Sequence, residues 1–295
     1  MSWLQIHLIT DKERAPLIEL LFENIGALSV TLGDAADEAL LEPAPGESPL
    51  WRQTRVSALF RGDSDADALR SAIAQTLGQD TGAELSMEVL EDQAWERAWL
   101  DAFRPMPFGR RLWVCPDGQQ PPVDDAVIVA LDPGLAFGTG THPTTALCLQ
   151  WLEGRDLRKR EVIDFGCGSG ILSVAALKLG AARAIAIDHD PQALEATRAN
   201  AEKNGVAGRI GIHPGGYRPA RPAPLLVANI LAGTLIELEP VLAGLVEPGG
   251  HIALSGILAE QADQVSACYR ADFEMEPPRQ LDDWILLEGR RLPIP

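Results

Sequence analysis

The chain has 295 residues, of which 46% are hydrophobic and 23% are charged, and its net charge is −17. This length favours two domains over one, and the composition suits a folded protein with a sizeable core, which excludes intrinsic disorder. No apolar run reaches the roughly 18 residues that span a membrane, and the start lacks the basic residues and cleavage site of a signal peptide, so we expect a cytoplasmic protein.

The first third reads as six short elements in the order strand, helix, strand, strand, helix, strand. They are expected at Trp3 to Ile9, Glu13 to Ile25, Ala27 to Leu32, Arg55 to Arg61, Ala66 to Leu77 and Glu84 to Leu90. This βαββαβ order predicts a small ferredoxin-like α+β domain. It contains no glycine-rich loop or paired catalytic groups, so it is expected to recognise a partner rather than to carry chemistry.

Acidic residues are concentrated in this third. Residues 1–92 hold 6 Lys and Arg against 17 Asp and Glu. The absence of a basic stripe argues against direct binding of nucleic acid, whereas an acidic surface would attract a basic partner protein. On charge alone, a merely solubilising surface is the simpler explanation.

A helix with two indoles follows. In Asp92 to Phe103, Trp95 and Trp99 are four residues apart and therefore share one helical face, and Pro105 and Pro107 end the helix. We take it as a linker that docks between domains, and so divide the chain into residues 1–91, 92–107 and 108–295. The last part is expected to begin with strands at Arg111 to Cys115 and Ala126 to Leu131.

The segment DPGLAFGTGTHPTT, residues 132–145, is rich in glycine, threonine and proline and precedes a helix expected at Ala146 to Leu152. Its glycines, Gly138 among them, permit close approach of a ligand to the backbone. Thr144 or Thr145 could cap the helix or touch a ligand, and both roles remain open. His142 could act as a base, but no Ser or Cys beside it forms a nucleophile motif.

A glycine-rich turn, VIDFGCGSG at residues 162–170, lies between an apolar run and a helix expected at Ile171 to Leu179. Its pattern is G-x-G-x-G, not the G-x-G-x-x-G of dinucleotide sites, and no Lys or Arg lies between Val162 and Leu177 to meet a phosphate. Asp188 ends the next strand, Ala184 to Ile187, where a carboxylate can accept hydrogen bonds from both hydroxyls of a ribose. A nucleoside with a zwitterionic tail fits better than NAD. These features resemble class I S-adenosylmethionine-dependent methyltransferases.

Strands and helices alternate beyond this turn, which predicts a mostly parallel sheet with helices on both faces, a Rossmann-like α/β domain. The expected elements are helix Pro191 to Asn204, strand Arg209 to His213, strand Leu225 to Ala228, helix Thr234 to Leu245, strand His251 to Ser255 and helix Glu260 to Arg270. The segments Phe273 to Arg279 and Trp284 to Glu288 could close the sheet with a hairpin. The methyltransferase resemblance implies that the last strand is antiparallel.

Asn229 closes a buried strand at the sheet edge where open α/β folds bind ligands. Many amine and amide methyltransferases have Asn-Pro-Pro-Tyr here, whereas this chain has Asn229-Ile230-Leu231. The Asn carboxamide can accept from a substrate N–H and aim the nitrogen lone pair, which is catalysis by orientation. Without the aromatic residue an aliphatic amine is the better substrate. The alternative is that Asn229 only forms a turn.

Other polar residues of the turn receive structural interpretations. Asp164 is expected to be a buried structural acid, and Cys167 a small loop residue rather than a nucleophile. The four cysteines are far apart and form no C-x-x-C pair, so no disulfide framework or metal site is expected.

Four motifs in order, DPGLAFGTGTHPTT, VIDFGCGSG, AIAIDHDPQAL and VANIL, behind an acidic βαββαβ domain, closely resemble the bacterial ribosomal protein L-eleven methyltransferase family over essentially the whole chain. The resemblance implies N-methylation of the α-amine and lysine amines of that basic ribosomal protein, gripped by the first domain. It places contacts to S-adenosylmethionine on Thr145, Gly166, Asp188 and Asn229, and we add Gly168, Thr144 and Gly138 as candidates.

Two alternatives differ in function. Another methyltransferase of this class could act on a different protein or a small-molecule amine. From a different class, an NAD-dependent oxidoreductase or an inactive nucleoside-binding module would share the glycine turn. We expect a monomer that binds neither nucleic acid nor membrane directly.

Overall fold

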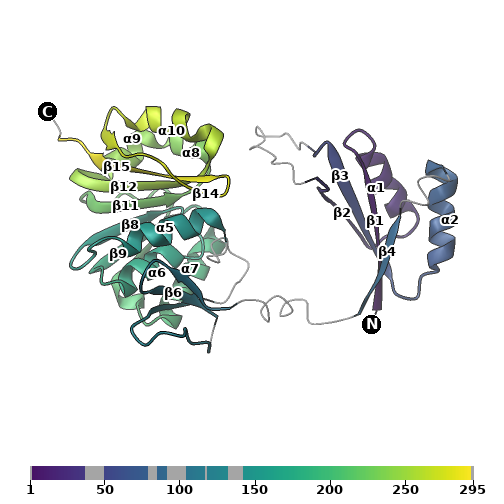
Figure 1. The fold of residues 1–295 in the computed structure, drawn as a ribbon, viewed down its shortest axis with the longest axis horizontal. Helices are drawn as coiled ribbons and strands as arrows, with labels where there is room; N and C mark the ends of the chain where they lie inside the picture. The colour runs from purple at the N-terminus through teal and green to yellow at the C-terminus, as the bar shows by residue number, and fades with distance from the viewer. Residues whose placement is uncertain are drawn as a thin grey trace. The chain divides into compact units, whose positions relative to one another are not determined.

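The computed structural model describes residues 2–36, 50–78, 85–91, 104–116, 118–131 and 142–293. The chain divides into two compact units, Met1–Trp99 and Leu100–Pro295, and each has its own hydrophobic core (Figure 1). The predicted helix at Asp92 to Phe103, Gly138 and the rest of residues 132–141 lie outside the described residues. No helix in the described part of the chain is long and apolar enough to cross a membrane.

The first unit is the predicted ferredoxin-like domain. Its elements are β1 (Ser2–Asp11), α1 (Ala15–Asn24), β2 (Ser29–Asp34), β3 (Gln53–Arg61), α2 (Ala66–Leu77) and β4 (Ser86–Glu91). The strands form an antiparallel sheet in the order β2-β3-β1-β4. Alternate residues of β1, Leu4, Ile6 and Leu8, are buried in a core shared with Ile18 and Phe22 of α1. The two helices therefore cover one face of the sheet (Figure 1).

The second unit is built on an eight-stranded sheet. Its strands are β8 (Glu161–Phe165), β9 (Arg183–Asp188), β10 (Ile210–Pro214), β11 (Ala223–Asn229), β12 (Val246–Leu258), β13 (Phe273–Met275), β14 (Arg279–Leu281) and β15 (Trp284–Arg291). The order is β10-β9-β8-β11-β12-β15-β13, with β14 beside β15. The first five strands in this order are parallel, and β15 is antiparallel to its neighbours. The prediction of a mostly parallel sheet with an antiparallel last strand is confirmed.

Helices cover both faces of this sheet (Figure 1). Successive residues of the central strands face opposite ways, so Val162 joins one core and Ile163 the other. One core includes residues of α5 (Pro143–Glu153), α6 (Ile171–Lys178) and α7 (Pro191–Lys203), and the other includes residues of α8 (Ala232–Glu237), α9 (Glu239–Gly244) and α10 (Ala262–Tyr269). A small separate sheet comprises β5 (Met106–Phe108), β6 (Leu112–Cys115) and β7 (Val127–Ala130).

One predicted helix is wrong in length. The single helix expected over Thr234 to Leu245 is two short helices, α8 and α9, which are joined at Leu238. Pro240 lies in the first turn of α9 and has no N–H to donate to a carbonyl of the preceding turn. The apolar periodicity continues through the break because both helices pack on the same core.

Candidate functional site

The predicted site residues that the structure describes gather at one edge of the large sheet. Gly166, Asp188 and Asn229 follow or end β8, β9 and β11, which are parallel neighbours or next-neighbours in the sheet. Parallel strands bring their carboxyl ends to the same edge, which is where open α/β sheets bind ligands. Thr145 lies in the first turn of α5, and its hydroxyl accepts a hydrogen bond from the Asn229 amide at 3.3 Å.

The glycine turn depends on left-handed backbone at three positions. Gly166, Gly168 and Gly170 have φ of 74°, 52° and 75°, a region that costs other residues about 1–2 kcal/mol each. The amides of Gly166 and Cys167 both donate to the carbonyl of Ile187, at 2.8 and 3.1 Å. A side chain at Gly166 would also collide with the Ile230 side chain. Without side chains at these positions, the turn presents bare backbone at the sheet edge. It leads directly into α6, whose N-cap is Gly170.

Asp188 presents an oriented carboxylate beside this turn. One oxygen accepts from the Gly168 amide at 2.9 Å, and the other accepts from the Asp190 amide at 3.0 Å. The residue is only 8% exposed, and it lines a cavity of about 380 Å³ with Phe165, Gly166, His189, Ile230 and Leu238. Each carboxylate oxygen has a further lone pair, so a vicinal diol in the cavity can donate to Asp188 without displacing the bonds that hold it.

Asp164 lies behind the turn and is fully buried. One of its oxygens accepts from the amide and the hydroxyl of Ser173, at 2.9 and 2.8 Å. The other oxygen has no hydrogen-bond partner among the described residues. Burial raises the pKa of Asp164 to about 6, although the Ser173 bonds oppose that shift.

Cys167 is poorly suited to nucleophilic chemistry. Its side chain is buried and its sulfur lies 3.4 Å from the Thr197 hydroxyl. Burial raises the pKa of the Cys167 thiol well above its usual range, and the charge of Asp164 adds to the effect. A thiol that stays protonated is a weak nucleophile.

Asn229 faces a second cavity, of about 320 Å³. It is lined by His142, Thr144, Asn229, Ile230, Leu231, Gly256 and Trp284. Ile230 and Leu231 line both cavities, so the two spaces adjoin. Because the Asn229 nitrogen donates to Thr145, the carboxamide oxygen is left as the acceptor for a ligand.

The cap of α5 differs from the prediction. Its N-cap is His142, whose Nδ1 accepts from the Thr144 amide at 3.3 Å, and neither threonine caps the helix. Pro143 has a fixed φ that suits the first helical position, so the helix starts earlier than expected. Thr144 and Thr145 are both buried, and their hydroxyls contact His142 and Asn229, respectively.

His142 is also poorly placed as a base. Its Nδ1 accepts from the Thr144 amide and lies 2.7 Å from the Thr144 hydroxyl. In the tautomer that accepts from this amide, Nε2 carries the proton. Burial lowers the pKa of His142, so the ring is neutral at pH 7 and serves as a cap.

Two lining residues of the second cavity were missed. Gly256 has φ of 85°, and a Cβ there would collide with the Ile230 backbone. The sequence could have indicated Gly256, because this residue follows the strand expected at His251 to Ser255. It therefore lies at the sheet edge where ligands bind. Trp284 begins β15, and its place depends on pairing across the sheet, which the sequence does not show.

The sheet order, the glycine turn after β8 and the acid that ends β9 define a class I, Rossmann-like methyltransferase domain. The family model "Ribosomal protein L11 methyltransferase (PrmA)" matches residues 2–292. The chain belongs to this family of S-adenosylmethionine-dependent protein methyltransferases.

Two similar proteins match nearly the whole chain, and a solved structure matches part of it. The ribosomal protein L11 methyltransferase of Hahella chejuensis is 52% identical over 293 residues, which span 99% of this chain and 100% of that protein. The one from Pseudomonas aeruginosa is 53% identical over 292 residues, 99% of each chain. A crystal structure of a ribosomal protein L11 methylase from Lactobacillus delbrueckii subsp. bulgaricus is 32% identical with a TM-score of 0.57, and the match covers 64% of this chain and all of that one.

Proposed function

We propose that this chain binds S-adenosylmethionine and transfers its methyl group to the α-amine and lysine ε-amines of ribosomal protein L11. The observation that carries the proposal is the pair of adjoining cavities at one sheet edge, one with Asp188 and the other with Asn229. Relatives named ribosomal protein L11 methyltransferase are 52–53% identical over nearly the whole chain. The proposed reaction takes place in the cytoplasm, where ribosomal proteins are made and assembled.

The residues of the first cavity fit a nucleoside. The carboxylate of Asp188 suits the two ribose hydroxyls, and the glycine turn at Gly166 is a cradle that any side chain would fill. Arg218 also lines this cavity, but it comes from the loop after β10 and not from the glycine turn. The proposed cofactor contacts are Thr144, Thr145, Gly166, Gly168, Asp188 and Asn229, together with Gly138.

The second cavity suits an amine. S-adenosylmethionine supplies a methyl group on a sulfonium, which needs no further activation. The substrate nitrogen must be neutral, and a lysine amine has a reference pKa of about 10.4. Since the lining is mostly apolar, desolvation lowers the pKa of an entering ammonium. The Asn229 carboxamide oxygen then accepts from an N–H of the amine and directs the lone pair.

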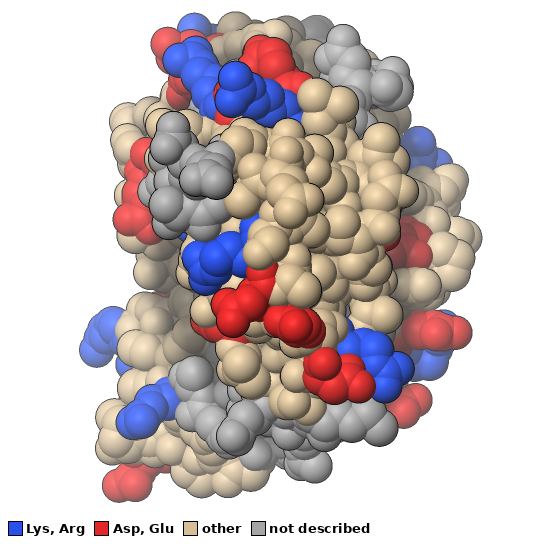
Figure 2. All heavy atoms as spheres, turned by 90° about the vertical axis from the view of Figure 1, so that its right-hand side faces the viewer, with Lys and Arg blue, Asp and Glu red and all other residues tan. Residues whose placement is uncertain are grey.

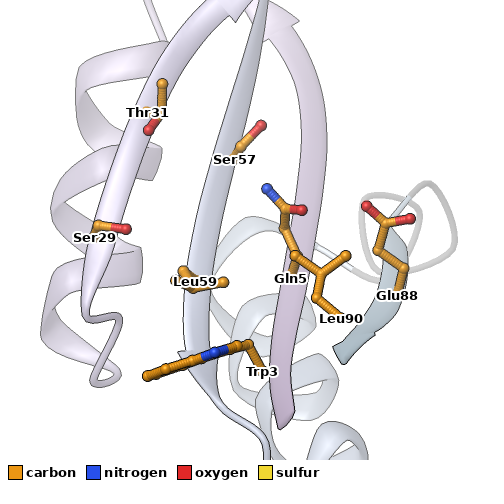
Figure 3. Close-up of a pocket in the computed structure, with 8 residues that line it drawn as sticks. All are labelled: Trp3, Gln5, Ser29, Thr31, Ser57, Leu59, Glu88 and Leu90. Atoms are coloured by element: carbon orange, nitrogen blue, oxygen red, sulfur yellow. The ribbon is translucent and has the colours of Figure 1, made fainter. Parts of the chain in front are cut away.

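We propose that a first domain, residues 1–91, recognises the substrate and that residues 92–107 link it to the catalytic domain, residues 108–295. The helices of the first unit lie behind its sheet, and no described helix of this unit covers the opposite face (Figure 3). That open face is hollowed to about 670 Å³ and is lined by Trp3, Gln5, Ser29, Thr31, Ser57, Leu59, Glu88 and Leu90. Apolar and hydrogen-bonding groups together suit a protein partner.

Charge supports a basic protein as that partner. The excess of 11 acidic over basic residues in residues 1–92 favours association with a basic ribosomal protein. On the face shown in Figure 2, the described Lys and Arg side chains form no continuous stripe. Such a stripe would be the mark of direct binding to a phosphate backbone.

Cofactor titration tests the first half of the proposal. We expect saturable binding of S-adenosylmethionine by calorimetry, loss of that binding in Asp188→Ala, and no binding of NAD. The exposed Glu202→Ala on α7 is the control and should bind as the wild type does. Binding of NAD without a response to S-adenosylmethionine would refute the proposal.

Methyl transfer tests the second half. Mass spectrometry of ribosomal protein L11 after incubation with enzyme and cofactor should show methylation at its α-amine and at lysines. Asn229→Ala should lower kcat by about 100-fold or more, an amount reasonable for lost orientation, while cofactor affinity falls less. Equal turnover by this variant would remove Asn229 from the mechanism.

A further inference from the structure

One wall of the second cavity is aromatic. The aromatic residue does not come from the segment after β11. Asn229-Ile230-Leu231 contains no aromatic residue, but Trp284 reaches the same cavity from the start of β15. Trp284 pairs with Leu258 of β12 and with Leu281 of β14. The turn between β14 and β15 precedes it, with Asp282 at φ of 52°.

The ring of Trp284 is held by a second ring. The imidazole of His142 packs against it edge to face, with centroids 4.8 Å apart and planes at 68°, an arrangement that aromatic pairs favour. His142 is in turn fixed by its bonds to Thr144. The indole is therefore braced by the start of α5, the same turn that positions Thr145 against Asn229.

The other described lining residues carry no formal charge at neutral pH. They are His142, Thr144, Asn229, Ile230, Leu231 and Gly256, and burial lowers the pKa of His142. An ammonium that enters this cavity meets no carboxylate among them. An indole face attracts such a cation through its quadrupole, and methylated ammonium groups, which are weakly hydrated, are well suited to it.

We propose that Trp284 is a specificity-determining residue, the wall that retains the substrate amine as it becomes methylated, so that successive methyl groups are added. This inference rests on the proposed amine methyltransferase function. In each step the neutral nitrogen forms a bond to the methyl carbon while the carbon–sulfur bond breaks and its electron pair returns to sulfur. The product ammonium then loses a proton to water, and S-adenosylhomocysteine leaves and is replaced by a new S-adenosylmethionine before the next transfer. A trimethylated nitrogen has no N–H to lose, and the series ends.

The test compares methylation states. Ribosomal protein L11 is incubated with limiting enzyme, and the intact masses are followed for the wild type, Trp284→Leu and Trp284→Phe. We expect Trp284→Leu to accumulate mono- and dimethylated product and to raise KM for dimethylated substrate about 3- to 30-fold, the range of a cation–π contact. Trp284→Phe should restore most of the trimethylated product. Affinity for S-adenosylmethionine should change less than about threefold in both variants.

A control and a second readout separate this role from a structural one. Trp113→Leu removes a half-buried indole of β6 that lines neither cavity, and should leave the product series unchanged. The second readout is the indole N–H signal of Trp284 in NMR spectra of the wild-type enzyme with S-adenosylhomocysteine, assigned by its loss in Trp284→Phe. Nα-acetyl-trimethyllysine should shift this signal, and its uncharged tert-butyl analogue should shift it far less.

The outcomes distinguish the two proposals. An unchanged proportion of trimethylated product in Trp284→Leu would overturn the inference and leave the proposed function standing. If the wild type does not methylate ribosomal protein L11, the proposed function fails, and the NMR titration alone decides the inference. In that case equal shifts by the charged and uncharged probes, or none, would overturn it.

Discussion

Gly166 has no side chain, and both its backbone conformation and the space beside it in the first cavity depend on that. Its φ of 74° disfavours any side chain, and a Cβ would collide with Ile230. We expect Gly166→Ala to lower affinity for S-adenosylmethionine at least tenfold and to destabilise the fold by about 1–3 kcal/mol. Calorimetry and thermal unfolding measure the two effects.

A matched glycine provides the control for that substitution. Gly208 has open space around its Cα and no positive φ, so Gly208→Ala should change neither quantity appreciably. If Gly166→Ala bound the cofactor as tightly as the wild type, the glycine turn would not be the cradle proposed for it.

Protonation of Asp164 makes the stability of the fold depend on pH. Because burial raises its pKa from 3.8 to about 6, the folded protein binds this proton more tightly than the unfolded chain does. Stability from this group is therefore fully present below pH 3.8 and is lost as the pH rises through about 6, by about 3 kcal/mol at most.

Asp164→Asn should remove this pH dependence. The amide oxygen can still accept from Ser173, and no charge is buried at neutral pH. We expect urea unfolding of the ligand-free variant to show higher stability than the wild type at pH 7 and a smaller fall between pH 4 and 7. A wild-type pH profile in the variant would show that Asp164 is not the group responsible.

At the scale of elements, two side chains of α7 hold the glycine turn through hydrogen bonds to its backbone. Thr197 donates to the carbonyl of Gly168 at 2.9 Å, and Asn200 donates to the carbonyl of Ser169 at 2.8 Å. Removal of one such bond costs about 1–2 kcal/mol. We therefore expect Asn200→Ala to weaken cofactor binding about 5- to 30-fold in a titration. Glu195→Ala, exposed on the same helix, is the control, and equal affinities of the two variants would contradict this role.

The central strands could be predicted closely from the sequence. The runs at 184–187 and 225–228 lie within β9 and β11 because strands buried on both faces leave an unbroken apolar signature. The break at Pro240 was missed because the apolar spacing continues across it. That spacing received more weight in the prediction than the N–H that proline lacks. Trp284 could not be placed in the site, since its position follows from strand pairing between segments distant in sequence. Residues from separate strand ends were easier to place, because parallel topology brings these ends to one edge.

At the scale of the whole molecule, the acidic charge and the chemistry are divided between the two units. Residues 1–92 carry 11 of the 17 net negative charges, whereas both cavities at the sheet edge belong to the second unit. Since the described cores do not share residues, we expect removal of the first unit to leave the packing of the second unit's core intact.

This division predicts the behaviour of a fragment of residues 104–295. We expect it to bind S-adenosylmethionine within about threefold of the full chain, because every described cofactor candidate lies in it. Methylation of ribosomal protein L11 should fall at least 100-fold, which corresponds to loss of about 3 kcal/mol of substrate binding. Calorimetry and mass spectrometry of the fragment and the full chain measure these effects. Undiminished methylation of ribosomal protein L11 by a fragment that binds the cofactor would contradict the proposed role of residues 1–91 in substrate recognition.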